Sequence, residues 1–191
     1  APIPNNLGIY IYSFHVPLFF VISGYLCSQK DISFSQFFLR RLCSLIVPYF
    51  TFSFFTFLIF IMRDIIGNSK NSGILLKQLI GIFYSNGIDN WMVHNYALWF
   101  LTCLFIVQIL FFTIRKFIKN DFQLIGILII SSIIGYVDSL YMPIRLPWSI
   151  DVSFTAIVFY GVGYILKQNK TKQNKTKDMI LTVICLGLNF I

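Results

Sequence analysis

The sequence predicts an all-α fold, a polytopic bundle of helices that crosses a membrane several times. Three observations predict it: 57% of the 191 residues are hydrophobic, only 12% are charged, and the mean hydropathy is +0.77. A soluble domain carries about 25% charged residues. The apolar residues also form runs close to the roughly 20 residues that a helix needs to cross a bilayer. We expect one membrane domain over residues 1–191, with about five full spans, a truncated sixth span and one amphipathic interfacial helix.

The first predicted span is Tyr10–Gln29, which contains His15 and Pro17 but no Asp, Glu, Lys or Arg. Pro17 cannot donate a backbone hydrogen bond and crowds the carbonyl of Ser13, so we expect the helix to kink there or to begin at about His15. A titratable side chain at membrane depth usually faces protein or a watery cavity. His15 and Ser23 can share one helix face. On spacing alone, His15 is either functional or a structural hydrogen-bonding group inside the bundle.

Later apolar runs predict the remaining elements. Pro48, early in the second span, frees the carbonyl of Ser44. The fourth span is short and needs Asp138–Met142 at the interface to reach across the bilayer. The amphipathic helix has apolar residues at helical spacing, typical of a helix that lies on the membrane surface or caps the bundle. These elements are spans at Cys43–Met62, Tyr96–Ile114, Phe122–Val137 and Pro147–Leu166, the amphipathic helix at Gly73–Tyr84, and a sixth span that starts at Met179 and is cut off.

The positive charges indicate how the bundle is oriented. The formal charge of +8 is spread over loops. The loops after the first, third and fifth spans hold three, three and five Lys and Arg, whereas the long loop after the second span dilutes its three over 33 residues. Because Lys and Arg favour the cytoplasmic side, we expect a multi-pass protein of the cell membrane with these loops in the cytoplasm. This distribution favours orientation and contact with membrane lipids over nucleic-acid binding. A chain that starts outside without a signal sequence also predicts a fragment that lacks an upstream helix.

Candidate binding residues lie near both predicted membrane faces. Arg40 and Arg41 precede the second span, where they are either phosphate ligands or positive-inside anchors. Asp151 is the one acid well inside a predicted span, and it either stabilises the positive end of its helix or orients a substrate hydroxyl. Trp99 lies near the outer boundary, as an interfacial anchor or a platform for a sugar. His94 falls on a loop, where we expect it to be solvated.

The sequence lacks the residue patterns that metal sites, disulfide frameworks, phosphate loops and catalytic triads require. The four cysteines lie in or beside apolar runs and form no C-x-x-C pair, which argues against a metal site or a disulfide framework. The sequence has no Gly-rich phosphate loop and no Ser-His-Asp set that spacing can assemble. We therefore predict no metal and no bound cofactor.

The stretch F-H-V-P-L-F-F-V-I-S-G-Y-L (Phe14–Leu26) resembles the F-H-M-P-L-F-F-x-x-S-G-[YF] signature of the acyltransferase-3 family of integral membrane O-acyltransferases. Its closest similarity is to the branch that includes fucose 4-O-acetylase and related polysaccharide O-acetyltransferases. Ser44 replaces a second basic residue that is common in the family, which leaves Arg40 and Arg41 to do its work. Weaker matches follow in the family's order and cover nearly the whole chain, at Arg41 with Leu45–Tyr49, Leu98–Leu101, Pro147–Asp151 and Phe159–Tyr164.

The resemblance implies a family of bundles with about ten helices that move an acyl group, usually acetyl from cytoplasmic acetyl-CoA, to a hydroxyl of a sugar or another acceptor. It implies a catalytic role for His15 in binding or polarising substrate. It also implies that arginines at the inner face, Arg40 and Arg41, hold the CoA phosphates. The family's principal catalytic histidine follows a glycine near the end of the first helix. This chain begins after that point, so the resemblance implies that the fragment alone is inactive.

We therefore expect a membrane O-acetyltransferase that moves acetyl from acetyl-CoA to a surface or exported glycan, with Ser23, Trp99 and Asp151 as substrate-binding residues. The alternative is a transporter or flippase of a glycan or lipid-linked sugar, because kinked helices with a buried histidine also suit transport. A third hypothesis is a structural membrane subunit without chemistry. Labelled acetyl-CoA distinguishes the first two hypotheses, because only an acyltransferase moves the label onto the glycan.

Overall fold

The computed structural model describes residues 6–27, 32–67, 72–85, 98–141 and 146–170, and within these ranges every regular element is a helix. The predicted all-α fold is confirmed. The sixth predicted span, from Met179, lies outside the described residues. In chain order the elements are α1 (Asn6–Leu26), α2 (Phe34–Arg41), the π-helix η1 (Leu42–Ile46), α3 (Val47–Ile66), α4 (Ser72–Tyr84), α5 (Trp99–Phe117), α6 (Asp121–Tyr141), the 3-10 turn η3 (Pro147–Ser149) and α7 (Ile150–Lys170).

The described residues contain 4 helical stretches that are long and apolar enough to cross a membrane. These stretches identify an integral membrane protein. The first helix, α1, has 21 residues, and its described side chains, from Phe14 to Leu26, form a shorter apolar stretch. The candidate spans are Phe34–Ile66, Trp99–Phe117, Asp121–Tyr141 and Pro147–Gln168.

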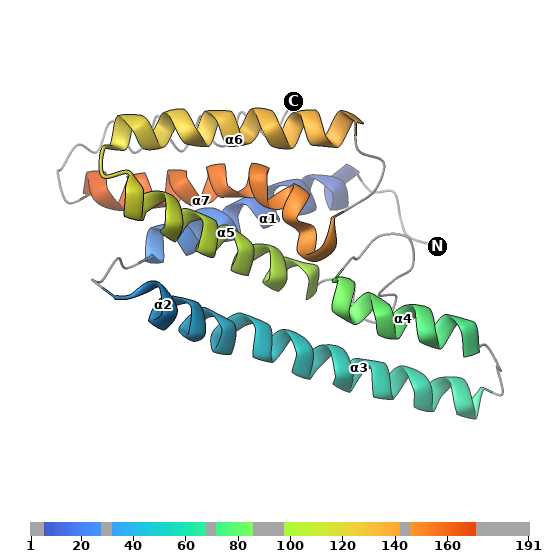
Figure 1. The fold of residues 1–191 in the computed structure, drawn as a ribbon. Coiled ribbons are helices and arrows are strands. Elements are labelled where there is room, and N and C mark those ends of the chain that lie inside the picture. Colours follow the sequence, from blue (N-terminus) through green and yellow to red (C-terminus); the bar gives the residue numbers. More distant parts are fainter. Residues whose placement is uncertain (1–5, 28–31, 68–71, 86–97, 142–145, 171–191) are drawn as a thin grey trace.

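Helix α7 lies at the centre of the bundle, packed against α1, α5 and α6 (Figure 1). Its contact with α1 is made by glycines. A Cβ at Gly24 would overlap the carbonyl oxygen of Tyr160, and a Cβ at Gly163 would overlap that of Val21. Small residues that let helix backbones touch are typical of membrane bundles. The largest fully buried side chains around this contact are Phe20, Phe111, Leu124, Ile157 and Tyr160.

The first helix passes through Pro17 without ending. Helix α1 starts at Asn6, so the expected start at about His15 is wrong. A proline inside a helix loses one backbone hydrogen bond. Membrane helices tolerate this loss because neighbouring helices and local adjustments satisfy the freed groups.

The second predicted span begins at Phe34 rather than Cys43 and continues to Ile66. Ser33 caps its start, because the Ser33 hydroxyl oxygen accepts a hydrogen bond from the backbone N–H of Gln36 at 3.3 Å. The early start escaped prediction from hydropathy because α2 is amphipathic and ends in two arginines. The resulting rod, α2 with α3, runs along one edge of the bundle (Figure 1).

The π-helical turn η1 joins α2 to α3. Its last bond runs from the backbone N–H of Val47 to the carbonyl of Leu42. Pro48 follows immediately and has no N–H to offer the carbonyl of Ser44, so the chain changes its hydrogen-bond register here. Turns of this kind often occur at functional sites, and this one directly follows Arg41.

The remaining helices match the predicted spans with shifted ends. Helix α6 continues to Tyr141, which gives the short fourth span the extra length that it needed. Helix α7 continues to Lys170, four residues beyond the predicted Leu166. Helix α4, predicted as the amphipathic element, lies alongside α3 (Figure 1). The hydroxyl of Tyr49 on α3 donates a hydrogen bond of 2.6 Å to the carbonyl oxygen of Ile82 on α4.

Candidate functional site

Asp151 marks the first candidate region, where α5 and α7 begin. We call this region the aspartate end and define it by Trp99, Thr102, Trp148 and Asp151. Asp151 lies in the first turn of α7 and is only 4% exposed. Because Asp151 is buried within the bundle, its carboxylate faces protein and not lipid. The position beside the positive end of the α7 dipole suits a carboxylate, and it is compatible with both roles expected for Asp151.

The backbone is strained at this end. Trp148 and Ser149, just before α7, have φ angles of 60° and 52°, and Ser85 after α4 has a φ of 54°. Such left-handed conformations cost a residue with a side chain about 1–2 kcal/mol. The indole Nε1 of Trp148 donates a hydrogen bond of 2.9 Å to the carbonyl oxygen of Phe83, and its ring contacts Phe105 edge-on at 6.2 Å. These contacts hold the strained turn and tie α7 to both α4 and α5.

Buried hydroxyls complete the aspartate end. The hydroxyl oxygens of Ser85 and Thr102 are 2.7 Å apart, and both residues are fully buried. The Thr102 hydroxyl also donates to the carbonyl oxygen of Trp99 at 2.8 Å. The structure thus places Trp99, which is partly buried, at the same end as Asp151. Ser85 and Thr102 were not predicted as site residues, and Trp148 was placed only within the Pro147–Asp151 motif. Hydroxyl residues beside an apolar run were the available signal for the first two.

His15 and Ser23 lie on α1, in different surroundings. His15 is exposed, and its ring packs edge-on against Phe19 with the centroids 4.7 Å apart. Phe19 in turn contacts Phe100 at 5.7 Å, next to Trp99. Ser23 is partly buried, two turns further along α1. The structure therefore connects His15 to the start of α5 through aromatic rings and leaves its own face open.

The two predicted arginines lie apart from these residues and point in different directions. Arg40 is exposed, whereas Arg41 is partly buried, with its guanidinium carbon 5.1 Å from the centroid of the Phe37 ring. Because successive helix residues are rotated by about 100°, two adjacent arginines cannot both face the bundle. Only Arg41 does so.

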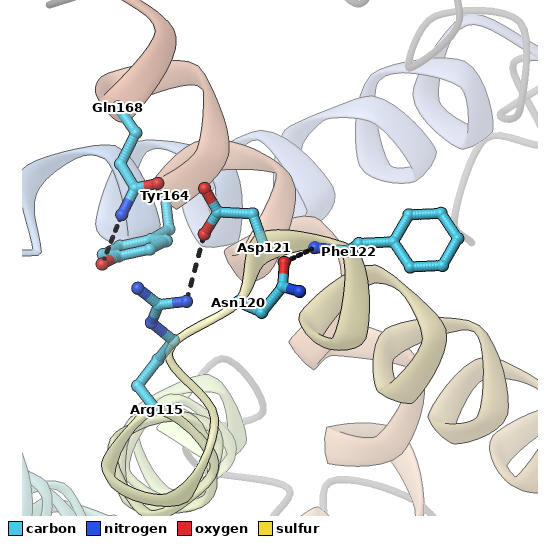
Figure 2. A network of polar contacts seen from close by, with 6 residues as sticks. All are labelled: Arg115, Asn120, Asp121, Phe122, Tyr164 and Gln168. Carbon is cyan, nitrogen blue, oxygen red and sulfur yellow. Dashed lines mark hydrogen bonds and ion pairs between the residues drawn. The ribbon is translucent and has the colours of Figure 1, made fainter.

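Further polar groups meet where α5 and α7 end. We call this region the arginine end and define it by Arg41, Arg115, Tyr164 and Lys167. Figure 2 shows the Arg115 guanidinium reaching the Asp121 carboxylate at 3.1 Å, beside Tyr164 and Gln168. The Arg115 guanidinium carbon is also 5.0 Å from the centroid of the Tyr164 ring. Sequence analysis treated Arg115 only as the end of a span.

Lys167 joins the arginine end from α7. Its ammonium group donates a hydrogen bond of 2.6 Å to the carbonyl oxygen of Cys27, just after α1. A cation at this place also suits the negative end of the α1 dipole. No sequence signal linked Lys167 to Cys27, because the two residues are 140 positions apart.

The two ends lie on the same pair of helices. Trp99 and Arg115 are 16 residues apart on α5, and so are Asp151 and Lys167 on α7, which corresponds to about 24 Å along each axis. The bundle thus carries cations at one end, and a buried carboxylate with hydroxyls at the other. Among the described residues, no group of three or more His, Cys, Asp or Glu could hold a metal ion. The arrangement can bind an anionic group at one end and a polar, hydroxylated group at the other.

Comparison with known protein families matches residues 2–191 to a family described as an acyltransferase domain. No curated protein and no solved structure matches the chain.

Proposed function

Because the chain belongs to the acyltransferase-3 family and is a membrane acyltransferase, we propose that it moves an acetyl group from acetyl-CoA to a hydroxyl group of a surface or exported glycan. The single observation that carries this proposal is the separation of charge along α5 and α7, with cations at the arginine end and Asp151 at the aspartate end. Such a bundle suits a reaction with an anionic donor on one side and a hydroxylated acceptor on the other.

On the donor side, Arg40 and Arg41 hold the phosphates of CoA. A guanidinium group offers paired N–H donors that match phosphate oxygens. Arg41 faces the bundle next to the π-helical turn, while Arg40 is exposed and available to a donor that approaches from the cytoplasm. In this proposal the basic loops and the arginine end are cytoplasmic, as the positive-inside rule favours.

On the acceptor side, Asp151 orients the sugar hydroxyl and Trp99 offers a flat apolar surface for the sugar ring. Ser23, next to the contact between Gly24 and Tyr160, provides a further hydroxyl between the two ends. Trp99 and Asp151 support this role by lying at one end of the bundle. The assignment to the branch that includes fucose 4-O-acetylase rests on the Phe14–Leu26 motif alone.

The chemistry is a transfer between a thioester and a hydroxyl. A base removes the acceptor proton while the hydroxyl oxygen attacks the thioester carbonyl, the carbon–sulfur bond breaks, and the CoA thiolate takes up a proton. Alternatively, an imidazole carries the acetyl group in between. His15 is our candidate for an imidazole that binds or polarises the acceptor, while the family's principal catalytic histidine is the candidate for the base, and the open face of the His15 ring leaves room for a substrate.

The test uses the protein expressed from its intact gene in its own membrane. Membranes supplied with acetyl-labelled CoA should transfer the label to the glycan. His15→Ala should abolish the transfer without loss of protein, since it removes the imidazole proposed to bind or polarise the acceptor. His94→Ala is the matched control, because it removes the other histidine of the chain and should leave the transfer unchanged.

Two outcomes would contradict the proposal. Glycan movement across the membrane without transfer of label would favour the transporter hypothesis. Full acetylation in the His15→Ala variant would remove His15 from the mechanism and leave the arginine and aspartate ends to be tested on their own.

A further inference from the structure

The arginine end brings together three cationic side chains, which is more positive charge than is required to hold the helices in place. Arg115 of α5 lies against Tyr164, whose ring packs on Phe111 with the centroids 5.1 Å apart. Arg41 of α2 lies over the Phe37 ring, which stacks on Phe112 of α5 at a centroid distance of 4.2 Å. Lys167 approaches from the same helix and is held at the end of α1. Three cations from α2, α5 and α7 therefore converge around one aromatic layer.

Arg115 is the most enclosed of these cations. Its side chain is 10% exposed, and its Nε is buried without a hydrogen-bond partner among the described residues. Its ion pair with Asp121 uses Nη1 alone. A buried donor that stays unused is costly, and a guanidinium carries five donors. The side chain thus keeps capacity for another anion.

Asp121 binds this guanidinium group only weakly. The carboxylate is 50% exposed, and exposed ion pairs contribute little to stability. Gln168 of α7 lies beside it, with its amide at the Tyr164 hydroxyl (Figure 2). In the amide orientation that satisfies both neighbours, Gln168 donates to the two carboxylate oxygens at 3.2 Å and 3.0 Å and accepts from the Tyr164 hydroxyl at 2.7 Å. A more highly charged anion could displace this carboxylate.

We propose that Arg115, together with Arg41 and Lys167, binds a phosphate group, and that Asp121 occupies Arg115 until the phosphate arrives. The inference rests on the proposed function, because the phosphate it assigns is that of the acyl-CoA donor. An anionic lipid headgroup carries the same chemistry and is the other possible source. A guanidinium group binds phosphate strongly through two parallel hydrogen bonds. Arg115 therefore determines the affinity for the acyl-CoA donor, and Asp121 lowers that affinity by competing for Arg115.

The first experiment measures binding without turnover. Protein purified in a neutral detergent is titrated with free coenzyme A, and inorganic diphosphate is used as a competitor. Arg115→Gln should weaken binding about 10- to 100-fold, the range for losing a charge-assisted contact. Arg115→Lys should recover part of it, because it restores the charge without the fork. Lys116→Gln and Lys119→Gln are matched controls on exposed cations and should bind like the wild type.

Asp121→Asn separates this proposal from a purely structural role. If Asp121 competes with phosphate, the variant should bind coenzyme A about 2- to 10-fold more tightly, in line with a weak exposed ion pair. If Arg115 only ties the α5–α6 corner together, Asp121→Asn should weaken binding as Arg115→Gln does. That outcome overturns the proposal, and so does unchanged binding in Arg115→Gln.

The lipid source is tested in phosphatidylcholine vesicles with and without phosphatidylglycerol. Thermal stabilisation by phosphatidylglycerol that is lost in Arg115→Gln, combined with unchanged coenzyme A binding, would overturn the donor assignment in favour of a lipid headgroup. Failure of the proposed function looks different, since a wild type that binds coenzyme A through Arg115 but transfers no label refutes the reaction and not the phosphate site.

Discussion

Two helix contacts in this bundle are built in opposite ways. Between α1 and α7, glycines at Gly24 and Gly163 bring backbone against backbone. Between α3 and α4, the contact is made by side chains, with the Tyr49 hydroxyl bonded to the Ile82 carbonyl and the rings of Phe50 and Phe83 at 5.7 Å. Much of the rest of α3 is exposed and apolar, as on Phe55 and Leu58.

The difference shows what holds helices together in lipid. Lipid tails are as apolar as leucine, so apolar side chains alone do not drive helices together, and close packing and hydrogen bonds must do so. The α1–α7 contact uses close packing, and the α3–α4 contact uses hydrogen bonds. We expect an added methyl group to disrupt the α1–α7 contact, and we expect the loss of a hydroxyl group to weaken the α3–α4 contact.

The largest effect should come from adding a methyl group at the α1–α7 contact. Gly24→Ala or Gly163→Ala places a Cβ against a backbone carbonyl that cannot move aside, as a flexible side chain could. We expect each to destabilise the protein by about 3 kcal/mol, at the upper end for overpacking. Thermal unfolding in detergent measures the loss.

Gly126→Ala is the control for that comparison. A Cβ at Gly126 on α6 meets no heavy atom within 4 Å, so the variant should gain up to about 1 kcal/mol from helix propensity. Equal losses at Gly24 and Gly126 would show that close α1–α7 packing does not carry this contact.

A smaller effect should follow from removing one hydroxyl at the α3–α4 contact. Tyr49→Phe keeps the ring and leaves the Ile82 carbonyl without its side-chain partner, at a cost of about 1–2 kcal/mol. Unfolding should register the loss, and amide exchange should quicken in α4. Tyr136→Phe on α6 serves as the control, because Tyr136 is 65% exposed and its substitution should leave both unfolding and amide exchange unchanged.

The smallest effect should appear where α4 meets the turn η3, just before α7. Trp148→Phe retains an aromatic ring against Phe105 but loses the hydrogen bond to the Phe83 carbonyl. We expect a loss of about 1 kcal/mol, with faster amide exchange at the end of α4 and none at the α1–α7 contact. Exchange that quickens equally in α1 would mean that the two contacts are coupled and not independent.

Prediction from sequence succeeded where local chemistry decides the outcome. The apolar runs located the described helices to within a few residues, and the short fourth span was expected to need Asp138–Met142, of which α6 includes the residues up to Tyr141. Prediction failed at α2, because an amphipathic start with two arginines does not resemble a span. At Pro17, the alternative of a helix that begins at about His15 was wrong, because α1 continues through the proline.

The candidate site was only partly accessible from sequence. Asp151 stood out as an acid inside an apolar run, and Arg40 and Arg41 as a basic pair. Which arginine faces the bundle depends on the rotation of α2 about its axis, and that is decided by the packing of α2 against the rest of the bundle. Arg115 and Lys167 looked like ordinary positive-inside charges, since their partners lie on other helices.

Composition and hydropathy by themselves determined that this chain is a helical membrane protein, because burying backbone in lipid allows few other folds. The order of motifs around Phe14–Leu26 predicted the family that the domain match then established. Only the tertiary structure decided which distant residues meet, from the Gly24–Tyr160 contact to the cations around Tyr164. The reason is physical: hydropathy is a property of each residue, whereas an ion pair or a close backbone contact depends on the rotation and depth of two helices at once.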